Sequence, residues 1–294
     1  MSVPQAVPQT IPQAVPYLME DRREAGRLVA KVDADGWVRE YLGPVLPALP
    51  AGAGRVLDVG AGPGHIAEAV LRARPETEVI AFDGNPERLA AGTGNTEGAA
   101  LVRRSGDARE LPFEDGSFDL VYSRLMLQYV AAREQAVAEM ARVTRPGGRV
   151  VLFDLDGQLV WHDPMGPELT ATLGPVTDAL AAAGFDPHTG RRLFALARRA
   201  GLTDLDVRVD PYHLIAGRID PVEREQWALK LDIARPLIAR ALGGSAEAAD
   251  RAVETFLAHL DSEETLTYSV AFTVTGRRPV GPVSPGGEAP AGSR

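Results

Sequence analysis

Residues 56–64 read Val56-Leu57-Asp58-Val59-Gly60-Ala61-Gly62-Pro63-Gly64, and this stretch decides the fold. Its first four residues form a short apolar run typical of a buried strand, and its glycines predict a tight turn. A helical pattern follows over residues 66–74. Glycines at such a turn let a ligand approach the backbone closely, and the helix N-terminus after them offers N–H groups. We therefore expect a strand, loop and helix that cradle a polar or anionic ligand.

The same alternation of strand-like apolar runs and helical patterns continues along the chain. This order predicts an α/β fold, in which a Rossmann-like sheet of seven strands has helices on both faces. We expect the last two helices to form a lid, inserted over about residues 211–262 between the last two strands. The expected strands are residues 55–59, 78–82, 100–103, 117–122, 148–154, 204–209 and 266–275, and the expected helices are 66–74, 86–91, 131–143, 191–200, 222–242 and 246–260.

The two ends of the chain differ in composition from its centre. Residues 1–16 carry proline at every fourth position, which forbids helix and favours an extended, disordered arm. Residues 17–50 begin with a helical pattern and predict a helical cap, which is also the expected contact in a homo-oligomer. Residues 279–294 are rich in proline and glycine and predict a flexible tail. The main domain is therefore expected over residues 51–278.

Composition excludes several classes of function. The chain has 294 residues, 45% of them hydrophobic, and a net charge of -9, which is the wrong sign for a protein that binds nucleic acid. It has no cysteine, so disulfides, thiolate metal sites and a cysteine nucleophile are excluded. The arm has no secretory signal pattern, and no apolar run reaches membrane-spanning length. We expect a cytoplasmic protein with no nucleic-acid, membrane or metal partner.

Two acidic residues narrow the identity of the ligand. Asp83 ends the next apolar strand about 20 residues beyond the loop, where a carboxylate suits a ribose diol. A nicotinamide dinucleotide is disfavoured because His65 stands where its fingerprint requires a third glycine. Asp58 would repel a pyrophosphate and attract the α-ammonium group of a methionine moiety. S-adenosyl-L-methionine is therefore the better candidate ligand.

At this point the chain resembles the class I S-adenosylmethionine-dependent methyltransferases, in particular the small-molecule group that includes the ubiquinone and menaquinone biosynthesis enzymes. The resemblance is strong over about residues 54–156 and weak elsewhere. It rests on several ordered motifs: Val56 to Gly64, Val79-Ile80-Ala81-Phe82-Asp83, Ser105-Gly106-Asp107-Ala108, Leu111-Pro112-Phe113, Phe118-Asp119-Leu120-Val121-Tyr122-Ser123 and Val143-Thr144-Arg145-Pro146-Gly147-Gly148-Arg149-Val150.

The resemblance implies a role for individual residues of these motifs. Gly60, Ala61 and Gly62 would lie against the methionine and ribose portions of the cofactor. Asp83 would hold the ribose hydroxyls with Gly84 beside it. Asp107 and the N–H of Ala108 would contact the adenine, and the backbone around Ser123 and Arg124 would face the methionine ammonium. The implied product is S-adenosyl-L-homocysteine.

The acceptor side of the site is less defined by the sequence. Methyl transfer from a sulfonium needs mainly placement of the nucleophile in a dry site, and a general base only when the acceptor loses a proton. His162 and His213 follow strand ends and are the candidate bases, while Tyr17 and Tyr129 are candidates to border the acceptor. We expect a small, partly apolar metabolite as acceptor. A non-methylating rearrangement or cyclisation on a protein that keeps the cofactor is the open alternative, because all the motifs concern the cofactor.

Overall fold

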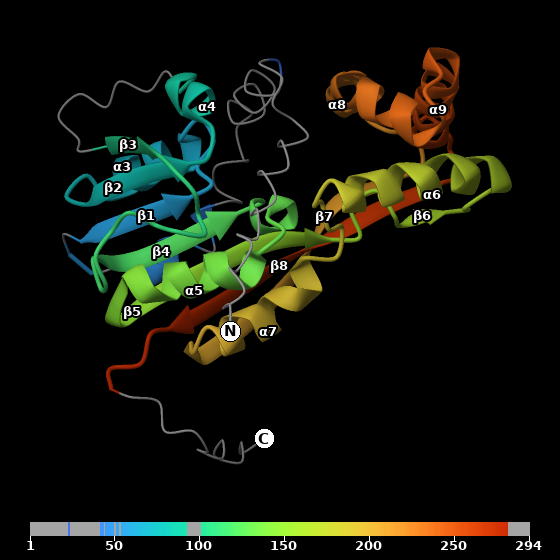
Figure 1. The fold of residues 1–294 in the computed structure, drawn as a ribbon. Coiled ribbons are helices and arrows are strands. Elements are labelled where there is room, and N and C mark those ends of the chain that lie inside the picture. The colour runs from blue at the N-terminus through green and yellow to red at the C-terminus, as the bar shows by residue number, and fades with distance from the viewer. Residues whose placement is uncertain are drawn as a thin grey trace, which may run out of the picture.

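The computed structural model describes residues 54–92 and 101–281, together with Arg23 and the short pieces 42–43, 45–49 and 51–52. Within these residues the protein is a twisted sheet with helices on both faces and a helical cap beyond one end (Figure 1). The strands are β1 (Arg55–Val59), β2 (Glu78–Asp83), β3 (Leu101–Ser105), β4 (Phe118–Arg124), β5 (Thr144–Asp156), β6 (His162–Asp163), β7 (Thr203–Ala216) and β8 (Leu266–Arg277).

The order of the strands is β3-β2-β1-β4-β5-β8-β6. Strand β7 also pairs with β8, along the edge of β8 that faces away from β5 and β6. Strands β1 to β5 run parallel, whereas β8 runs antiparallel to both β5 and β7. The expected seven strands are confirmed, and β6 is a short addition that pairs with the first two residues of β8. The chain reverses its direction of travel across the sheet between β1 and β4, which is where open α/β sheets bind ligands.

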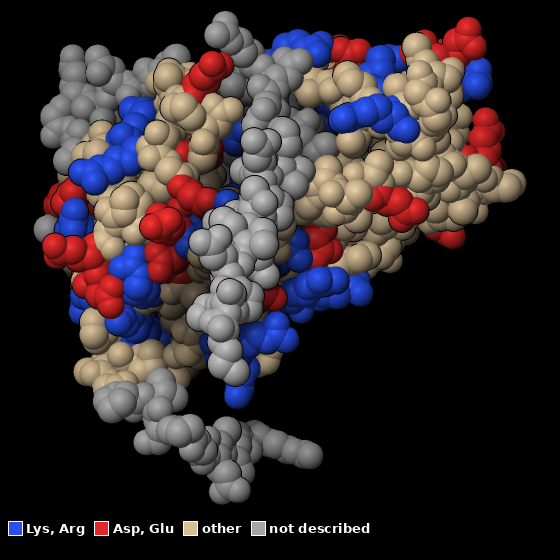
Figure 2. All heavy atoms as spheres, in the orientation of Figure 1, with Lys and Arg blue, Asp and Glu red and all other residues tan. Residues whose placement is uncertain are grey.

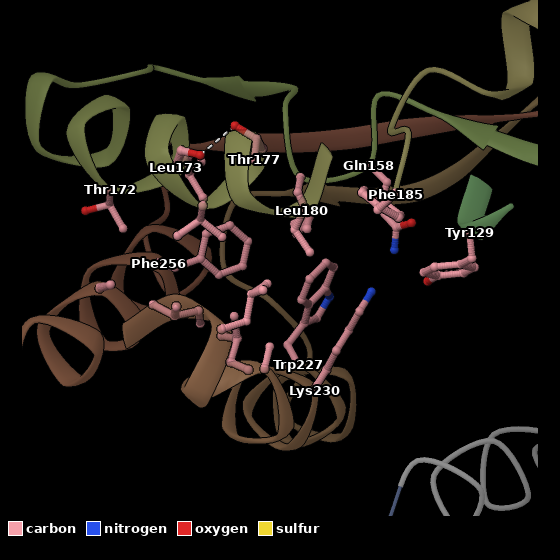
Figure 3. A pocket seen from close by; sticks show the side chains of 17 residues that line it. Tyr129, Gln158, Thr172, Leu173, Thr177, Leu180, Phe185, Trp227, Lys230 and Phe256 are labelled. Carbon is pink, nitrogen blue, oxygen red and sulfur yellow. Dashed lines mark hydrogen bonds between the residues drawn. The ribbon is translucent and has the colours of Figure 1, made fainter. Parts of the chain in front are cut away.

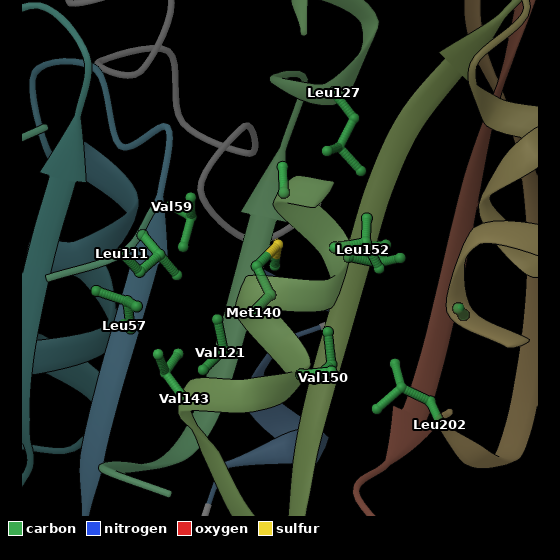
Figure 4. Close-up of a cluster of buried hydrophobic side chains, with 14 of the residues drawn as sticks. Leu57, Val59, Leu111, Val121, Leu127, Met140, Val143, Val150, Leu152 and Leu202 are labelled. Atoms are coloured by element: carbon green, nitrogen blue, oxygen red, sulfur yellow. The ribbon is translucent and has the colours of Figure 1, made fainter. Parts of the chain in front are cut away.

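Both faces of the parallel strands are covered, which explains their nearly continuous apolar sequences. On one face, Leu57, Val121 and Leu152 of the sheet pack against Met140 of α5 (Figure 4). On the other face, alternate residues of the same strands, such as Val56, pack against α3. The helices are α3 (His65–Ala73), α4 (Pro86–Ala90), α5 (Arg133–Val143), α6 (Pro167–Ala182), α7 (Leu193–Arg199), α8 (Pro221–Ala241) and α9 (Ala246–Leu260), with short 3₁₀ turns η1 (Leu46–Ala48), η2 (Leu127–Tyr129) and η3 (Gly190–Arg192).

The helical cap beyond the end of the sheet contains the lid predicted between the last two strands, and it consists of three helices rather than the expected two. Helices α8 and α9 lie between β7 and β8, as predicted, and α6 joins them from the segment before β7 (Figure 1). The sequence did not predict α6 because Gly174-Pro175 stands in its middle and is typical of a break. Packing overrides this signal, since Leu173, Val176 and Leu180 of α6 are buried against the other two helices.

The N-terminal predictions lie mainly outside the described residues. These are the predicted arm 1–16, most of the predicted N-terminal segment 17–50 with Tyr17, and most of the predicted tail 279–294. Arg23 is described, and its Nη1 donates to Oδ2 of Asp232 in α8 at 2.6 Å. This ion pair joins the segment predicted as an N-terminal helix to the lid.

The surface carries charges of both signs. On the face shown in Figure 2, acidic and basic side chains intermingle over the sheet domain, and the cap shows a larger uncharged area. Among the described residues, no helix combines the length and the apolar character that crossing a bilayer requires.

Candidate functional site

The glycine loop after β1 is tied to the end of β2. The N–H groups of Gly60 and Ala61 both donate to the carbonyl of Phe82, at 2.8 and 3.0 Å. The N–H of Gly62 donates to Oδ2 of Asp83 at 2.8 Å. Gly60, Gly62 and Gly64 have φ of 81°, 56° and 90°, a region that favours glycine. The loop is therefore held open in front of α3 by contacts with the neighbouring strand.

Asp83 is buried and organises the turn at the end of β2. Besides Gly62, its carboxylate accepts from the N–H of Asn85 at 2.9 Å and pairs with Nη1 of Arg88 at 3.4 Å. The Asn85 side chain in turn caps α4 by accepting from two N–H groups, with Pro86 in the first turn. A carboxylate has about four acceptor positions, so capacity remains for a ligand hydroxyl.

Met126 closes the loop from the side of β4. A Cβ added at Gly60 would lie 2.4 Å from Cγ of Met126, so only glycine fits beneath this side chain. The residue before it, Leu125, has φ of 51°, which is unusual for a branched side chain. Strained backbone of this kind concentrates at functional sites. Neither Leu125 nor Met126 was predicted from the sequence.

Asp58 lies under the loop, on the face covered by α3. It is 2% exposed, and its Oδ2 makes no hydrogen bond within the described residues. Burial raises the pKa of Asp58 to about 7, against the opposing influence of the neighbouring Tyr122 hydroxyl and of Arg124. Burial also raises the pKa of Tyr122 well above 10, with Asp58 adding to the rise. A buried carboxylate with an unpaired oxygen fits a role toward a cationic ligand group.

Gly84, Asp107 and Ala108 come together beside the ends of β2 and β3. A Cβ at Gly84 would lie 3.7 Å from the Gly106 carbonyl, so the two turns face each other. The Asp107 carboxylate is half-exposed and chelated by Arg109, with contacts of 2.6 to 2.9 Å. This side-chain pairing lowers the pKa of Asp107. The adenine role of Asp107 stays a prediction, and its carboxylate already pairs with Arg109, a contact that was not predicted from the sequence.

Ser123 and Arg124 end β4 next to the loop. Ser123 pairs with Val59 across the strands, is buried, and its Oγ makes no hydrogen bond within the described residues. The Arg124 guanidinium lies over the Phe153 ring at 5.0 Å, and its Nη2 donates to the Tyr212 hydroxyl at 3.3 Å. Arg124 therefore connects the end of β4 with β7.

A further buried carboxylate, Asp154, was not predicted from the sequence. It is fully buried near the end of β5, where it accepts from the N–H groups of Gln128 and Leu155 at 3.1 and 3.0 Å. Burial raises its pKa to about 7, and these two N–H groups oppose the rise. Its place inside an apolar run, two residues before Asp156, was the signal that could have identified it.

The two candidate bases lie in different surroundings. His162 belongs to β6, where it is 7% exposed, its Nδ1 is 2.9 Å from Oγ1 of Thr267, and its ring meets Phe256 edge-on at 5.4 Å. Burial lowers the pKa of His162 to about 4, and His259 adds to this effect. His213 lies within β7, next to Tyr212, with Nδ1 3.2 Å from Oγ of Ser269. The two rings are nevertheless joined through other rings, because His162 packs on Phe256, Phe256 on Trp227, and Trp227 on His213.

Tyr129 lies where the sheet domain meets the cap. It belongs to η2, just after β4, and packs against Phe185 at 5.3 Å. Its side chain lines an apolar cavity among the cap helices (Figure 3). The other acceptor candidate, Tyr17, is not among the described residues.

In the part of the chain that the structure describes, no group of three or more acidic or histidine side chains is arranged to hold a metal.

Comparison with known proteins agrees with this arrangement. Residues 57–152 match the family model described as a methyltransferase domain. The chain is 37% identical over 167 residues to an uncharacterised 37.1 kDa protein of transposon TN4556 from Streptomyces fradiae, covering 55% of this chain and 48% of that protein. It is 39% identical over 109 residues to the ubiquinone/menaquinone biosynthesis C-methyltransferase of Dinoroseobacter shibae, covering 36% and 44% of the two chains.

Solved structures show the same fold. One of them is phosphoethanolamine N-methyltransferase 2 of Haemonchus contortus in complex with phosphomonomethylethanolamine and S-adenosylhomocysteine, which has a TM-score of 0.53 and 20% identity and covers 82% of this chain and 52% of that one. The chain spans about half the length of the two curated relatives described above. The glycine loop, the strand order and the family match lead to one conclusion: residues 57–152 belong to a methyltransferase domain of the class I S-adenosylmethionine-dependent type.

Proposed function

We propose that this protein transfers the methyl group of S-adenosyl-L-methionine to an O, N or C nucleophile of a small, partly apolar metabolite. The observation that carries the proposal is the hydrogen bond from Gly62 to Asp83, because it joins the two cofactor motifs of a methyltransferase domain into one cradle. We place the reaction in bacterial secondary metabolism, since the arginine-rich, proline-rich composition is typical of high-GC bacteria and one similar protein comes from Streptomyces.

The residues around the loop fit the cofactor. Asp58 Oδ2 and Ser123 Oγ are buried without hydrogen-bond partners among the described residues, on two adjacent strands. We assign Asp58, directly or through water, and the backbone at Ser123 and Arg124 to the methionine ammonium. Asp83 is assigned to the ribose, and the backbone N–H of Ala108 to the adenine. Asp107 would contact the adenine amino group while it keeps its pairing with Arg109.

When bound, the cofactor supplies a methyl group that is already activated on a sulfonium. The chain's own contribution is therefore mainly placement of the acceptor and exclusion of water. The glycine loop fixes one side of the site, because Gly60 is held under Met126 and to Phe82. The cap formed by α6, α8 and α9 supplies an apolar enclosure on the acceptor side.

A general base is needed only for an acceptor that loses a proton. His162 and His213 remain our candidates. Contacts connect His213 to the cofactor motifs. Its ring touches Tyr212, and the Tyr212 hydroxyl accepts a hydrogen bond from Arg124 at the end of β4. The lowered pKa of His162 keeps its ring neutral at pH 7, so it could accept a proton there, but its ring packs inside the cap.

The similar proteins do not define the acceptor atom. One is a C-methyltransferase by its description and another an N-methyltransferase. We therefore propose transfer to a small molecule without assigning O, N or C.

Product analysis tests transfer itself. The purified protein is incubated with cofactor labelled on its methyl group and a panel of apolar acids, phenols and amines. We expect labelled product and S-adenosylhomocysteine in equal amounts. Conversion of an acceptor to an unlabelled isomer, with the cofactor unchanged, would instead support the rearrangement or cyclisation alternative.

A further inference from the structure

The cap contains an apolar cavity that the cofactor motifs do not explain. It lies among α6, α8 and α9, and apolar side chains form most of its wall (Figure 3). Leu173 and Leu180 come from α6, Ile238 from α8 and Phe256 from α9. A wall of this kind suits an aliphatic or aryl group, because removal of apolar surface from water favours binding.

The turn after β5 brings a polar side chain, that of Gln158, to this wall. Gly157 before it has φ of 85°, and a Cβ added there would collide with the Trp161 ring. Leu159 after it has φ of 66°, which a branched side chain rarely adopts. The N–H of Gly157 donates to the carbonyl of Pro187 at 2.9 Å and anchors the turn. Gln158 is therefore held in place by strained backbone, which concentrates at functional sites.

Gln158 lies at the end of the cavity nearest to the cofactor motifs. In Figure 3 its side chain is near that of Tyr129, whereas Phe256 and Thr172 lie farther along the cavity. Gln158 follows β5 and Tyr129 follows β4, so this end of the cavity is next to the carboxyl ends of the parallel strands. Ligands of open α/β sheets bind at these ends, and it is here that we place the cofactor.

The amide oxygen of Gln158 is the observation that points to a ligand. Gln158 is 5% exposed, and its Oε1 makes no hydrogen bond with any described residue. An amide oxygen can only accept, so the partner that it lacks is a donor. Burial of an acceptor without a donor is costly, and a bound molecule that brings an O–H or N–H group to this oxygen would remove that cost.

The donor group of such a molecule should be neutral. The described residues that line the cavity include no acidic side chain, so an ammonium group would be buried there without a carboxylate partner from the wall. A carboxylate has no donor when it is ionised, and its negative charge would face the lone pairs of Oε1. A hydroxyl or an uncharged N–H group on an apolar body meets both conditions.

We propose that this cavity binds an apolar molecule whose neutral O–H or N–H group donates to Oε1 of Gln158, and that this molecule is the methyl acceptor. Its apolar body lies among α6, α8 and α9, and its donor lies at the end next to the cofactor motifs. The identification of this ligand as the acceptor rests on the proposed function. The inference adds a substrate class that neither the methyltransferase fold nor the cofactor motifs specify.

Binding of four naphthalene derivatives to the full chain tests the need for a donor. Calorimetry is run with naphthol, naphthylamine, methylnaphthalene and naphthoate, each substituted at the same ring position. We expect one site per chain, with naphthoate the weakest ligand, and the tighter of naphthol and naphthylamine distinguishes a hydroxyl from an N–H donor. Tighter binding of naphthoate than of both neutral donors would overturn the proposal without requiring any variant.

Two variants assign the preference to the Gln158 amide. Gln158→Leu removes the acceptor oxygen, and we expect the ratio of naphthol affinity to methylnaphthalene affinity to fall about tenfold. The ratio is compared because a general loosening of the cavity weakens both ligands, whereas loss of the acceptor affects only the donor. Gln158→Met keeps an unbranched side chain and should lower the ratio similarly. A wild-type ratio in either variant that folds would contradict the assignment.

Gln226→Leu is the matched control. Gln226 belongs to α8, and its Oε1 also makes no hydrogen bond within the part of the chain that the structure describes. Its side chain is not among the described residues that line the cavity. We therefore expect the wild-type ratio of affinities in Gln226→Leu. An equal fall of the ratio in this variant would show that the effect does not come from contact with the ligand, and would contradict the role of Gln158.

Titration with S-adenosylhomocysteine in the same samples separates this inference from the proposed function. Binding of S-adenosylhomocysteine to the wild type, with no change of the ratio in the Gln158 variants, overturns only the substrate class. A fall of the ratio in these variants without S-adenosylhomocysteine binding to the wild type would support the cavity assignment and contradict the proposed methyl transfer.

Discussion

The N–H of Gly62 donates to Oδ2 of Asp83 at 2.8 Å, which makes one carboxylate both a structural anchor of the glycine loop and the candidate ribose ligand. The same carboxylate holds the N–H of Asn85 and pairs with Arg88. The shape of the loop and the affinity for the cofactor should therefore depend on the same residue.

Replacement of this residue gives the first prediction. Asp83→Asn keeps the size of the side chain but removes its charge and one acceptor oxygen. We expect binding of S-adenosylhomocysteine to weaken by about 10- to 100-fold, since a hydrogen bond to a charged group contributes about 1.5–3 kcal/mol. Calorimetry measures the affinity.

Asp119→Asn is the matched control for this prediction. Asp119 also accepts from a backbone N–H, that of Arg55, and it lies at the opposite ends of the strands. This variant should lower stability while leaving the affinity unchanged. A similar loss of affinity in both variants would show that the effect of Asp83→Asn comes from general destabilisation.

The fit of Gly60 beneath Met126 gives the second prediction. Gly60→Ala places a Cβ 2.4 Å from Cγ of Met126 and also forces alanine into a φ of 81°. The backbone part of this strain costs about 1–2 kcal/mol. We expect lower thermal stability and weaker cofactor binding, with partial recovery when Met126→Gly is added, because the Cβ of Met126 would also lie 2.6 Å from the new Cβ. No recovery in the double variant would show that Met126 does not limit the residue at position 60.

The buried carboxylates give a pH prediction. The pKa of Asp58 is raised from 3.8 to about 7. Between these two pH values the folded protein retains a proton on this carboxyl that the unfolded chain has lost. The stability that this group contributes is therefore complete below about pH 4 and is lost as the pH rises through 7. A cationic ligand group favours the ionised form, so cofactor affinity should rise about tenfold per pH unit up to about pH 7 and then level off.

Two variants assign this pH dependence. Asp154 has a pKa raised to about the same value, so it could produce a similar slope. We expect the rise in affinity between pH 6 and pH 7 to persist in Asp154→Asn and to disappear in Asp58→Asn. The reverse pattern would assign the ammonium to the end of β5 and contradict the role given to Asp58.

The two candidate bases should respond differently to substitution. His162→Asn removes a ring that packs against Phe256 inside the cap, so we expect it to lower the free energy of unfolding by about 1–3 kcal/mol and to change turnover little. His213→Asn should affect turnover more, because its ring contacts Tyr212, which accepts a hydrogen bond from Arg124 at the end of β4. Melting curves and initial rates measure both. A large loss of turnover in His162→Asn at an unchanged melting temperature would identify His162 as the base.

Much of the fold follows from local signals in the sequence. The strands of residues 55–156 are short apolar runs, and the loops between them contain glycine or a capping residue such as Asn85. Predicted and observed strand ends differ by only a few residues there. The two-residue strand β6 and helix α6 could not be predicted in this way, because pairing with β8 creates the first and tertiary packing overrides Gly174-Pro175 in the second.

The site shows the same division. The position of Asp83 beside the glycine loop could be predicted because its distance along the chain corresponds to one helix and the strand that follows it. The pairing of Asp107 with Arg109 and the position of Gln158 at the cavity depend on side-chain contacts that no spacing specifies. His213 was expected after its strand, but β7 continues to Ala216 because it pairs with β8 far into the cap.

The most direct test of the central claim is a calorimetric titration of the full chain with S-adenosylmethionine. We predict one site per chain, and weaker binding in Asp83→Asn while Asp119→Asn retains the wild-type affinity. Absence of binding to the folded wild-type protein, or unchanged binding in Asp83→Asn, would contradict the claim that the Gly62–Asp83 cradle holds this cofactor.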